Sequence, residues 1–421
     1  ISSILAAMVR NRCSHAVLEV SSHALHQGRT AGLRFDVAIF TNLSGDHLDY
    51  HGTMEAYAAA KARLFEQLPS NGIAVVNADD PWSLRMIRDT RAGIICCRRV
   101  GREPRLSEDT TGGRGDASSA STWAQAAVAH ECSVEVLRSG LVESDVRFIG
   151  PWGEFTAPVR LPGDHNAMNM LQAIAAVWWA LKLNGTPIKA TVLAELVSAG
   201  EAPAGRLQPV SAATEDADGT LPSSSSSEPL QVPAPAVLVD YAHTDDALAN
   251  ALDSVRAVLR KGQRLGVVFG CGGDRDRGKR PRMARVACDR ADFVCLTSDN
   301  PRTEDPVAIV GEILTGVPDH FDRAHLLIEP DRRRAIEKAI KHCRAEDVLV
   351  IAGKGHEDYQ IVGTTRRPFD DRVIAGLALR RWLETGGSTT PSRRPTISQR
   401  ELKSGQPSSS PRGHNDRSLA M

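Results

Sequence analysis

Polar residues that could bind a metal ion or do catalysis follow two apolar runs near the start of the sequence. Glu19 lies in the run at 15–20 (HAVLEV), and the run at 36–43 (DVAIFTNL) leads into 44–51 (SGDHLDYH), which contains His47. If both runs are parallel strands, their carboxyl ends lie at the edge of the sheet where ligands bind. A carboxylate and an imidazole there would suit Mg²⁺ or Mn²⁺ holding phosphate oxygens. The structural alternatives are a serine pair capping the next helix and solvated loop histidines.

Two asparagines stand one helical turn apart in the segment 163–169 (GDHNAMN), directly before a long apolar pattern. Asn166 and Asn169 therefore share one face of the first turn of a predicted helix. Paired amides in that position can reach a nucleotide base. The structural alternative is a helix cap, and the pattern alone does not separate the two.

A glycine-rich segment at 270–280 (GCGGDRDRGKR) follows the apolar run LGVVF. Such a turn offers backbone N–H groups to an anion. Gly273, Gly278 and Lys279 have the spacing of a nucleotide-binding P-loop, but Arg280 stands where the magnesium-binding Ser or Thr belongs. We therefore predict a loop that binds phosphate or carboxylate, and we do not assign it as a P-loop.

Charged residues of both signs follow two later strand-like runs. The segment 298–302 (SDNPR) ends in Arg302, and 353–360 (GKGHEDYQ) contains Lys354, His356 and Glu357. Arginine forms a bidentate fork for a carboxylate, whereas Asp and Glu can hold an ammonium group. A pocket with both signs is suited to a zwitterion such as an amino acid. The alternative for SDNPR is a turn that Pro301 pre-forms.

The elements that must position these residues alternate between strand and helix. Apolar runs at 15–20, 36–43 and 72–78 are separated by helical patterns, and a second alternating series runs through 236–386. This alternation predicts an α/β fold with two Rossmann-like domains, the first built on a mostly parallel sheet. We expect a central domain over 1–210, a low-complexity insertion at 211–235, the second domain over 236–386 and a disordered tail at 387–421. Residues 101–122 also have the composition of an exposed loop.

Composition limits the possible classes of protein. The 421 residues include 51 Lys and Arg and 51 Asp and Glu, so the formal net charge is zero. This balance argues against binding nucleic acid or an anionic membrane through overall charge. The longest apolar run, 173–181, is too short to span a membrane. Eight cysteines without a Cys-x-x-Cys pair indicate buried, reduced thiols of a cytoplasmic protein.

Taken in order, these segments resemble the Mur ligases, the ATP-dependent amide ligases of peptidoglycan synthesis, and most closely their diaminopimelate-adding type. The resemblance covers residues 1 to about 385. It is carried by EVSSHAL (19–25), FTNLSGDHLDYHGTMEAYAAAK (40–61), VNADDP (76–81), VDYAHT (239–244), VFGCGGDRDRGKRP (268–281), TSDNPRTEDP (297–306) and AGKGHEDYQ (352–360).

The resemblance implies an enzyme that adds meso-2,6-diaminopimelate to UDP-N-acetylmuramoyl-L-alanyl-D-glutamate through an acyl phosphate, with ATP as co-substrate and Mg²⁺ as cofactor. It implies that Glu19, His47 and a carbamylated Lys61 form the catalytic magnesium site. It further assigns Ser21 and Arg29 to the UDP-linked substrate, and Asn166, Asn169, Arg206 and Asp240 to ATP. The diaminopimelate pocket would contain Arg280, Asp299, Asn300, Arg302, Gly353 and Glu357. We expect a cytoplasmic monomer without nucleic-acid or membrane partners.

The sequence departs from this family at its start. Residue 1 corresponds to a position just after the P-loop of the family's central domain, and the preceding UDP-binding domain is also missing from these 421 residues. We therefore expect the chain as written not to turn over ATP. The alternatives are a non-catalytic paralogue or binding module, and another ligase of the superfamily such as a folylpolyglutamate or cyanophycin synthetase. Residues 299–302 (DNPR) argue against the latter.

Overall fold

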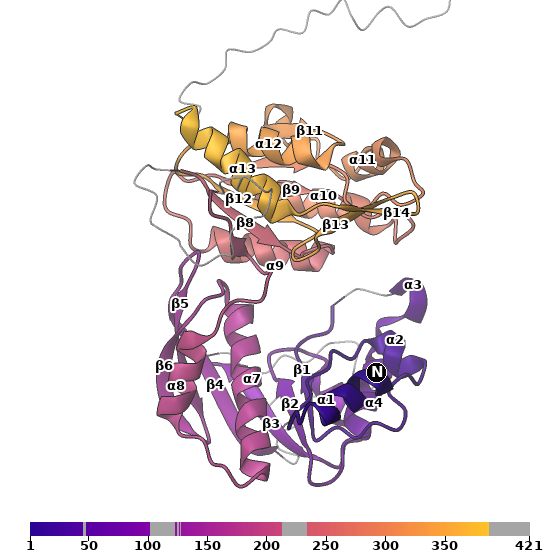
Figure 1. The fold of residues 1–421 in the computed structure, drawn as a ribbon, viewed down its shortest axis with the longest axis vertical. Coiled ribbons are helices and arrows are strands. Elements are labelled where there is room, and N and C mark those ends of the chain that lie inside the picture. Colours follow the sequence, from indigo (N-terminus) through magenta and orange to yellow (C-terminus); the bar gives the residue numbers. More distant parts are fainter. Residues whose placement is uncertain (45–47, 102–122, 124–125, 127, 213–233, 387–421) are drawn as a thin grey trace, which may run out of the picture.

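The computed structural model describes residues 1–44, 48–101, 123, 126, 128–212 and 234–386. They form two α/β units, each built around a twisted sheet with helices against it (Figure 1). The fold class expected from the sequence is therefore confirmed. Four predicted features lie wholly or mostly outside the described residues: His47, the loop at 101–122 (from residue 102 on), the low-complexity insertion at 211–235 (residues 213–233) and the tail after Gly386.

The first unit is built on a sheet in which β1 (Val37–Phe40), β2 (Ile73–Asn77), β3 (Gly93–Arg99) and β4 (Val128–Arg138) run parallel in that order. The antiparallel strands β5 (Ser144–Gly150) and β6 (Gly153–Val159) complete it. Alternate side chains of the central strands face opposite layers. Val75 and Ile95 pack with α7 (Asp164–Leu183) and α8 (Ala190–Ala199), whereas Ala74 and Val76 pack with α4 (Met54–Glu66) and α5 (Ser83–Ile87). Both faces of these strands are therefore buried, which explains their continuous apolar sequences.

The expectation of a strand at 15–20 was wrong, because these residues form neither a strand nor a helix. They follow α1 (Ser2–Arg10), a helix with no buried residue. Val17 is 96% exposed, and in the described sheet β1 is the edge strand. An apolar alternation becomes a strand only when a neighbouring strand takes up its backbone hydrogen bonds, and no described strand pairs with these residues.

The second unit contains six strands of one sheet in the order β11-β10-β9-β12-β8-β7. Their bounds are β7 (Gln208–Pro209), β8 (Ala236–Asp240), β9 (Leu265–Phe269), β10 (Phe293–Leu296), β11 (Leu326–Ile328) and β12 (Val348–Ala352). All pair in parallel except β7 with β8. Side chains of α9 (Asp245–Arg256), α10 (Lys279–Arg290) and α11 (Pro306–Leu314) pack on one face, and those of α12 (Arg332–His342) and α13 (Asp371–Glu384) on the other.

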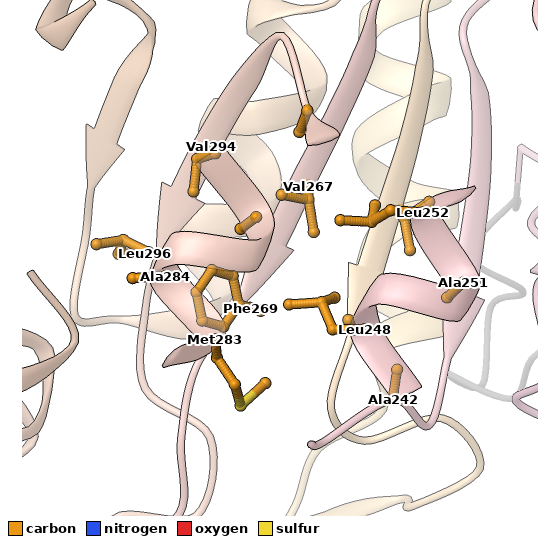
Figure 2. Packing of buried hydrophobic residues seen from close by; sticks show 14 of the residues in the cluster. Ala242, Leu248, Ala251, Leu252, Val267, Phe269, Met283, Ala284, Val294 and Leu296 are labelled. Carbon is orange, nitrogen blue, oxygen red and sulfur yellow. The ribbon is translucent and has the colours of Figure 1, made fainter. Parts of the chain in front are cut away.

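The core between α9, α10 and this sheet is dense. Leu248 and Leu252 of α9 and Met283 of α10 surround Val267 and Phe269 of β9, and all five side chains are completely buried (Figure 2). Burying a side chain of this size contributes about 1.5–3 kcal/mol relative to leaving it exposed. The core therefore fixes the direction of β9, and with it the loop that follows at its carboxyl end.

The connection between the units differs from the boundary expected at residue 210. Strand β7 already pairs with β8 of the second sheet, and Leu207 belongs to the core against α9. The chain therefore joins the second unit by about residue 205, before the low-complexity segment.

A hairpin of β13 (Tyr359–Val362) and β14 (Thr365–Pro368) follows β12. Two short helices, α2 (Ser22–His26) and α3 (Leu48–His51), lie in the first unit.

The expectation that the cysteines are buried free thiols is confirmed for seven residues. All eight thiols are free, seven of them are buried, and only Cys13 is exposed. Burial raises the pKa of Cys96 to about 11 and that of Cys271 to about 12.

Within the described parts of the chain, no helix has the length and apolar character required to cross a membrane.

Candidate functional site

The candidate site lies beyond the carboxyl ends of the second sheet. Because β8, β9, β10 and β12 are parallel, the segments that follow them emerge at one edge. The structure brings together four predicted segments there: 240–243, 270–280, 298–302 and 353–360. Gly353 N donates to Asp240 O at 3.0 Å, and Gly273 N donates to Asn300 O at 2.9 Å, so the loops are joined through their backbones.

Lys354 occupies the centre of this cluster and is completely buried. Its Nζ donates to Asn300 Oδ1 at 3.0 Å and to the carbonyl oxygen of Tyr359 at 2.8 Å. The same ammonium lies 3.2 Å from Asp299 Oδ1 and 3.6 Å from Glu357 Oε2. The sequence placed Lys354 at this cleft without giving it a role.

The glycines on either side explain how a lysine can point inward at the end of a strand. Gly353 and Gly355 have φ angles of 118° and 54°, which side chains with a Cβ rarely adopt. A Cβ at Gly355 would also lie 2.6 Å from the Cβ of Tyr241. The Gly-Lys-Gly sequence therefore reverses the backbone within three residues and directs the lysine side chain into the interior.

Asn300 connects the two charged segments. Its amide nitrogen donates to Glu357 Oε2 at 3.0 Å, while its Oδ1 also accepts the backbone N–H of Ile361 at 2.9 Å. Gln360 Nε2 donates to the carbonyl oxygen of Asp299 at 2.6 Å. Of the predicted pocket residues, the structure thus brings Asp299, Asn300 and Glu357 into direct contact with one another or with Lys354.

Arg302 lies at the rim with an unusual backbone. Its φ is 51°, one of four positive values among the non-glycine residues in the described ranges. Its backbone N–H donates to Ile361 O at 3.1 Å, and its Nη1 donates to Gly273 O at 2.8 Å. Strained backbone of this kind persists only where surrounding contacts enforce it, and it is frequent at functional sites. The contacts with the hairpin and the glycine-rich loop supply that enforcement here.

The glycine-rich loop uses its N–H groups inside the protein. Asp274 N donates to Glu304 and Gly278 N to Asp276, in addition to the bond from Gly273 to Asn300. The structure therefore offers little support for an anion site built on these three groups. Lys279 Nζ likewise donates to the carbonyl oxygen of His243 at 2.9 Å.

Arg280 is completely buried beneath this loop. Its guanidinium donates to Glu304 at 2.8 and 2.9 Å and to Glu312 at 2.7 Å. Arg280 also donates to the carbonyl oxygen of Gly272 and therefore supports the glycine-rich loop from inside the protein. Through Glu304 it also contacts the segment that carries Arg302. The hydrogen bonds that Glu304 accepts from Arg280 lower the pKa of the Glu304 carboxyl to about 2.

Asp240 and Arg206, which the resemblance assigns to ATP, lie together beside Tyr241. Asp240 accepts the backbone N–H groups of Leu207 at 2.7 Å and Ala242 at 2.8 Å. Burial raises the pKa of Asp240, and these two hydrogen bonds partly oppose the shift. Arg206 is exposed, with its guanidinium carbon 5.5 Å from the centre of the Tyr241 ring.

The two predicted amides open α7 in the first unit. Asn166 is buried and donates to Pro162 O at 2.8 Å, whereas Asn169 is exposed. No side chain caps the helix at Gly163, so the helix-cap alternative is wrong here. This helix start contacts the second unit, because Ser254 Oγ of α9 lies 3.4 Å from His165 Nδ1. The residues assigned to ATP therefore come from both units, near their contact.

The predicted metal site in the first unit is only partly described. Glu19 is exposed, and Ser21 caps α2 by accepting the N–H of Ala24 at 3.2 Å, as the structural alternative expected. Lys61 lies in α4 with its Nζ 5.3 Å from the centre of the Tyr57 ring, and its charge acts on Asp80. In the described ranges no group of three His, Cys, Asp or Glu residues could hold a metal ion, and His47 lies outside them. Arg29, assigned to the UDP-linked substrate, is exposed just after α2.

Three side chains without a predicted role fix the backbone that follows β1. Gln172 of α7 donates to Phe40 O at 2.7 Å, and Asn77 donates to Thr41 O at 2.8 Å. Asp80 accepts the N–H of Leu43 at 3.1 Å. The sequence signal was the polar cluster NADD at 77–80, directly after a buried strand. These contacts hold Phe40, Thr41 and Leu43, which precede the segment with His47 in the sequence.

Comparisons with known proteins agree with this arrangement. The family model described as Mur ligase middle domain matches residues 1–177, and the one described as Mur ligase, glutamate ligase domain matches 228–355. The chain is 43% identical over 375 residues to UDP-N-acetylmuramoyl-L-alanyl-D-glutamate–2,6-diaminopimelate ligase of Synechococcus elongatus, covering 89% of this chain and 64% of that protein. It is 42% identical over 379 residues to the protein of the same name from Gloeobacter violaceus, covering 90% and 66%.

The fold is shared more widely. A solved structure of Mycobacterium tuberculosis folylpolyglutamate synthase, complexed with ADP and AMPPCP, superimposes with a TM-score of 0.52 at 18% identity, over 82% of this chain and 63% of that one. The chain thus spans slightly under two thirds of the length of the curated relatives it matches. The two family models match most of the chain, on either side of the low-complexity segment. The chain therefore belongs to the Mur ligase family.

Proposed function

We propose that this chain is the central and C-terminal part of an ATP-dependent ligase that joins meso-2,6-diaminopimelate to UDP-N-acetylmuramoyl-L-alanyl-D-glutamate in peptidoglycan synthesis. The observation that carries the proposal is the charged cluster beyond the second sheet, where Asp299 and Glu357 pair with Lys354 and Arg302 follows in the same loop as Asp299. A site that binds an amino acid with two carboxylates and two ammonium groups needs side chains of both charge signs. The names of the relatives support the same acceptor.

In this proposal the pocket residues divide the recognition of the acceptor by charge. The carboxylates of Asp299 and Glu357 attract an ammonium group, while the guanidinium of Arg302 binds a carboxylate of diaminopimelate as a fork. Asn300 and Gly353 shape the surface between them. Arg280 contributes by holding the loop next to Arg302, since its own guanidinium is occupied by Glu304 and Glu312.

ATP would bind where the two units meet. Asn166 and Asn169 at the start of α7, together with Arg206 and Asp240 from the second unit, surround that contact. Ser21 and Arg29 would hold the UDP-linked substrate on the first unit. The substrate's γ-carboxylate attacks the terminal phosphorus of ATP, which releases ADP and gives an acyl phosphate. The diaminopimelate amine then attacks the acyl carbon, displaces phosphate and loses a proton, which leaves the amide. Closure of the units would bring the two reactants together.

The donor set proposed for Mg²⁺ is Glu19, His47 and carbamylated Lys61. A carboxylate and a carbamate are hard oxygen donors, which fits this ion, whereas an unmodified Lys61 ammonium would repel it. When bound, the ion would neutralise phosphate charge. Localisation in the cytoplasm and a monomeric state belong to this proposal as well.

The decisive experiment measures ADP release by the protein that includes the upstream region of the open reading frame. We expect turnover only with both the UDP-linked dipeptide and meso-diaminopimelate, and a severe loss in Lys61→Ala that short carboxylates partly restore. The 421-residue chain alone should not turn over ATP, and turnover by it would contradict that expectation. Turnover with a folate or a cyanophycin primer in place of the dipeptide would contradict the proposal. Binding of diaminopimelate without any turnover by the longer protein would favour the non-catalytic alternative.

A further inference from the structure

We propose that Lys354 is the positioning residue that sets the shape and charge of the acceptor pocket, an inference that rests on the proposed function. The starting observation is its burial. Lys354 is the one lysine among the described residues whose side chain is completely buried. Burying an ammonium group costs free energy unless hydrogen bonds and opposite charges compensate for it. The contacts of Lys354 should therefore show what the buried charge does.

Every polar contact of the Lys354 ammonium leads to the candidate pocket. Its two hydrogen bonds go to Asn300 Oδ1 at 3.0 Å and Tyr359 O at 2.8 Å, and its two ion pairs join Asp299 at 3.2 Å and Glu357 at 3.6 Å. Asp299, Asn300 and Glu357 are three of the proposed acceptor residues, and Tyr359 begins the hairpin that holds the Arg302 backbone through Ile361. The ammonium therefore joins separate parts of one pocket.

The hydrogen bonds also decide which way the Asn300 amide faces. Its Oδ1 receives both the Lys354 ammonium and the backbone N–H of Ile361, so its Nδ2 is left to donate to Glu357 Oε2 at 3.0 Å. Without the lysine, one of the two donors that fix this orientation disappears. The Glu357 carboxylate would then lose both a charge partner and the anchor of its hydrogen-bonded neighbour.

The charges give a second reason. Asp299 and Glu357 both lie within 3.6 Å of the same ammonium. If Lys354 is removed, two carboxylates face each other across a partly buried space and repel. They would move apart, which alters the surface offered to an ammonium group of the acceptor. Lys354 thus acts through the residues that touch substrate and is not itself predicted to touch it.

The test compares Lys354→Met with a matched variant of the same sheet. Arg264→Met also replaces a cation by methionine, and Arg264 pairs with the buried Asp347 at the opposite end of β9. Binding of meso-diaminopimelate to the 421-residue chain would be measured by calorimetry, with circular dichroism and melting temperature as folding controls. We expect at least a tenfold weaker Kd in Lys354→Met and less than a twofold change in Arg264→Met. Equal Kd values for wild type and Lys354→Met, or equal losses in both variants, would overturn the inference.

A measurement on the wild-type chain covers the case in which Lys354→Met does not fold. A buried, hydrogen-bonded ammonium exchanges its protons slowly and can be observed by ¹H–¹⁵N spectroscopy of lysine side chains. Addition of meso-diaminopimelate should shift this resonance, whereas L-alanine at the same concentration should not. If the resonance stays unchanged at saturating diaminopimelate, Lys354 is not coupled to the acceptor pocket and the inference is wrong. If wild type does not bind diaminopimelate at all, the proposed acceptor itself is wrong, which is a different outcome from loss of binding in the variant only.

Discussion

At the scale of single residues, Arg302 combines a proposed specificity role with a strained backbone, and the two can be separated. Arg302→Ala and Arg302→Gly both remove the guanidinium, so both should reduce the preference for diaminopimelate over L-lysine by roughly ten- to a hundred-fold, the worth of a charge-assisted hydrogen bond of ~1.5–3 kcal/mol. This ratio of kcat/KM values would be measured on the protein that includes the upstream region. A ratio that is unchanged in both variants would assign Arg302 to the scaffold alone.

The stability of the same two variants should differ, because the backbone φ at this position is 51°. A left-handed residue with a Cβ costs roughly 1–2 kcal/mol. Glycine avoids that cost but loses about 0.4–1 kcal/mol through the entropy of the unfolded chain. We therefore expect Arg302→Gly to be more stable than Arg302→Ala by up to about 1.6 kcal/mol in urea unfolding. A more stable alanine variant would show that the loop relaxes once the guanidinium is gone.

Glu304 predicts a specific acid sensitivity. Hydrogen bonds from Arg280 lower its pKa from 4.5 to about 2, so the folded state favours the ionised carboxylate. Stability from this group is complete above pH 4.5 and is lost as the pH falls towards 2. The free energy of unfolding should therefore decrease less steeply over this range in Glu304→Gln than in wild type. Glu346→Gln, which changes an exposed glutamate of the same unit, serves as control and should retain the wild-type slope.

Residue types and spacing predicted which residues gather in the proposed acceptor cluster but left out the groups that support them. Asp299, Asn300 and Glu357 were predicted and do lie together. The roles of Lys354, Asn77 and Gln172 could not be predicted, because each depends on contacts with residues far away in the sequence, such as the bond from Gln172 to Phe40 across 132 positions. The ligation of a metal ion by Glu19, His47 and Lys61 stays a prediction.

At the scale of elements, periodicity predicted most strands and helices of both sheets, including β2 at Ile73–Asn77 and α7 at Asp164–Leu183. It was wrong at 15–20, since an apolar pattern does not report whether a neighbouring strand is present. It also placed residues 205–210 in the first domain, although β7 pairs with β8. A two-residue strand carries no recognisable period, so its partner could not be predicted from the sequence.

The early entry of the chain into the second unit can be tested at Gly205. Its φ is 73°, and an added Cβ would collide with the backbone of Gly355 and His356, whereas Gly185 has a φ of 71° and open space around it. Gly185→Ala should therefore cost only the backbone strain of roughly 1–2 kcal/mol. Gly205→Ala should cost clearly more, because the linker must also move away from the second unit. Urea unfolding followed through the second unit would measure both, and equal losses would contradict the packing.

At the scale of the whole molecule, the two units differ in how well their sheets are covered. Strands β9, β10 and β12 have every residue buried, whereas edge strand β1 includes Ile39 at 40% exposure and α1 has no buried residue. Amide exchange reports such differences, because thinly packed elements open locally without unfolding the rest. Among the residues that the structure describes, residues 2–20 should exchange first in hydrogen exchange and β9, β10 and β12 last. Protection at 15–20 equal to that of β9 would show that these residues are covered in solution.

The distribution of thiols makes the native chain a ready substrate for site-selective labelling. Seven cysteines are buried, and burial raises the pKa of several of them, so few of their thiolates are available to an electrophile. Cys13 is exposed between α1 and residues 15–20. A maleimide dye added to the folded protein should therefore attach once per molecule, at Cys13, as intact-mass spectrometry and peptide mapping would show. A fluorophore could then be placed next to the proposed Glu19 site without changing a single residue.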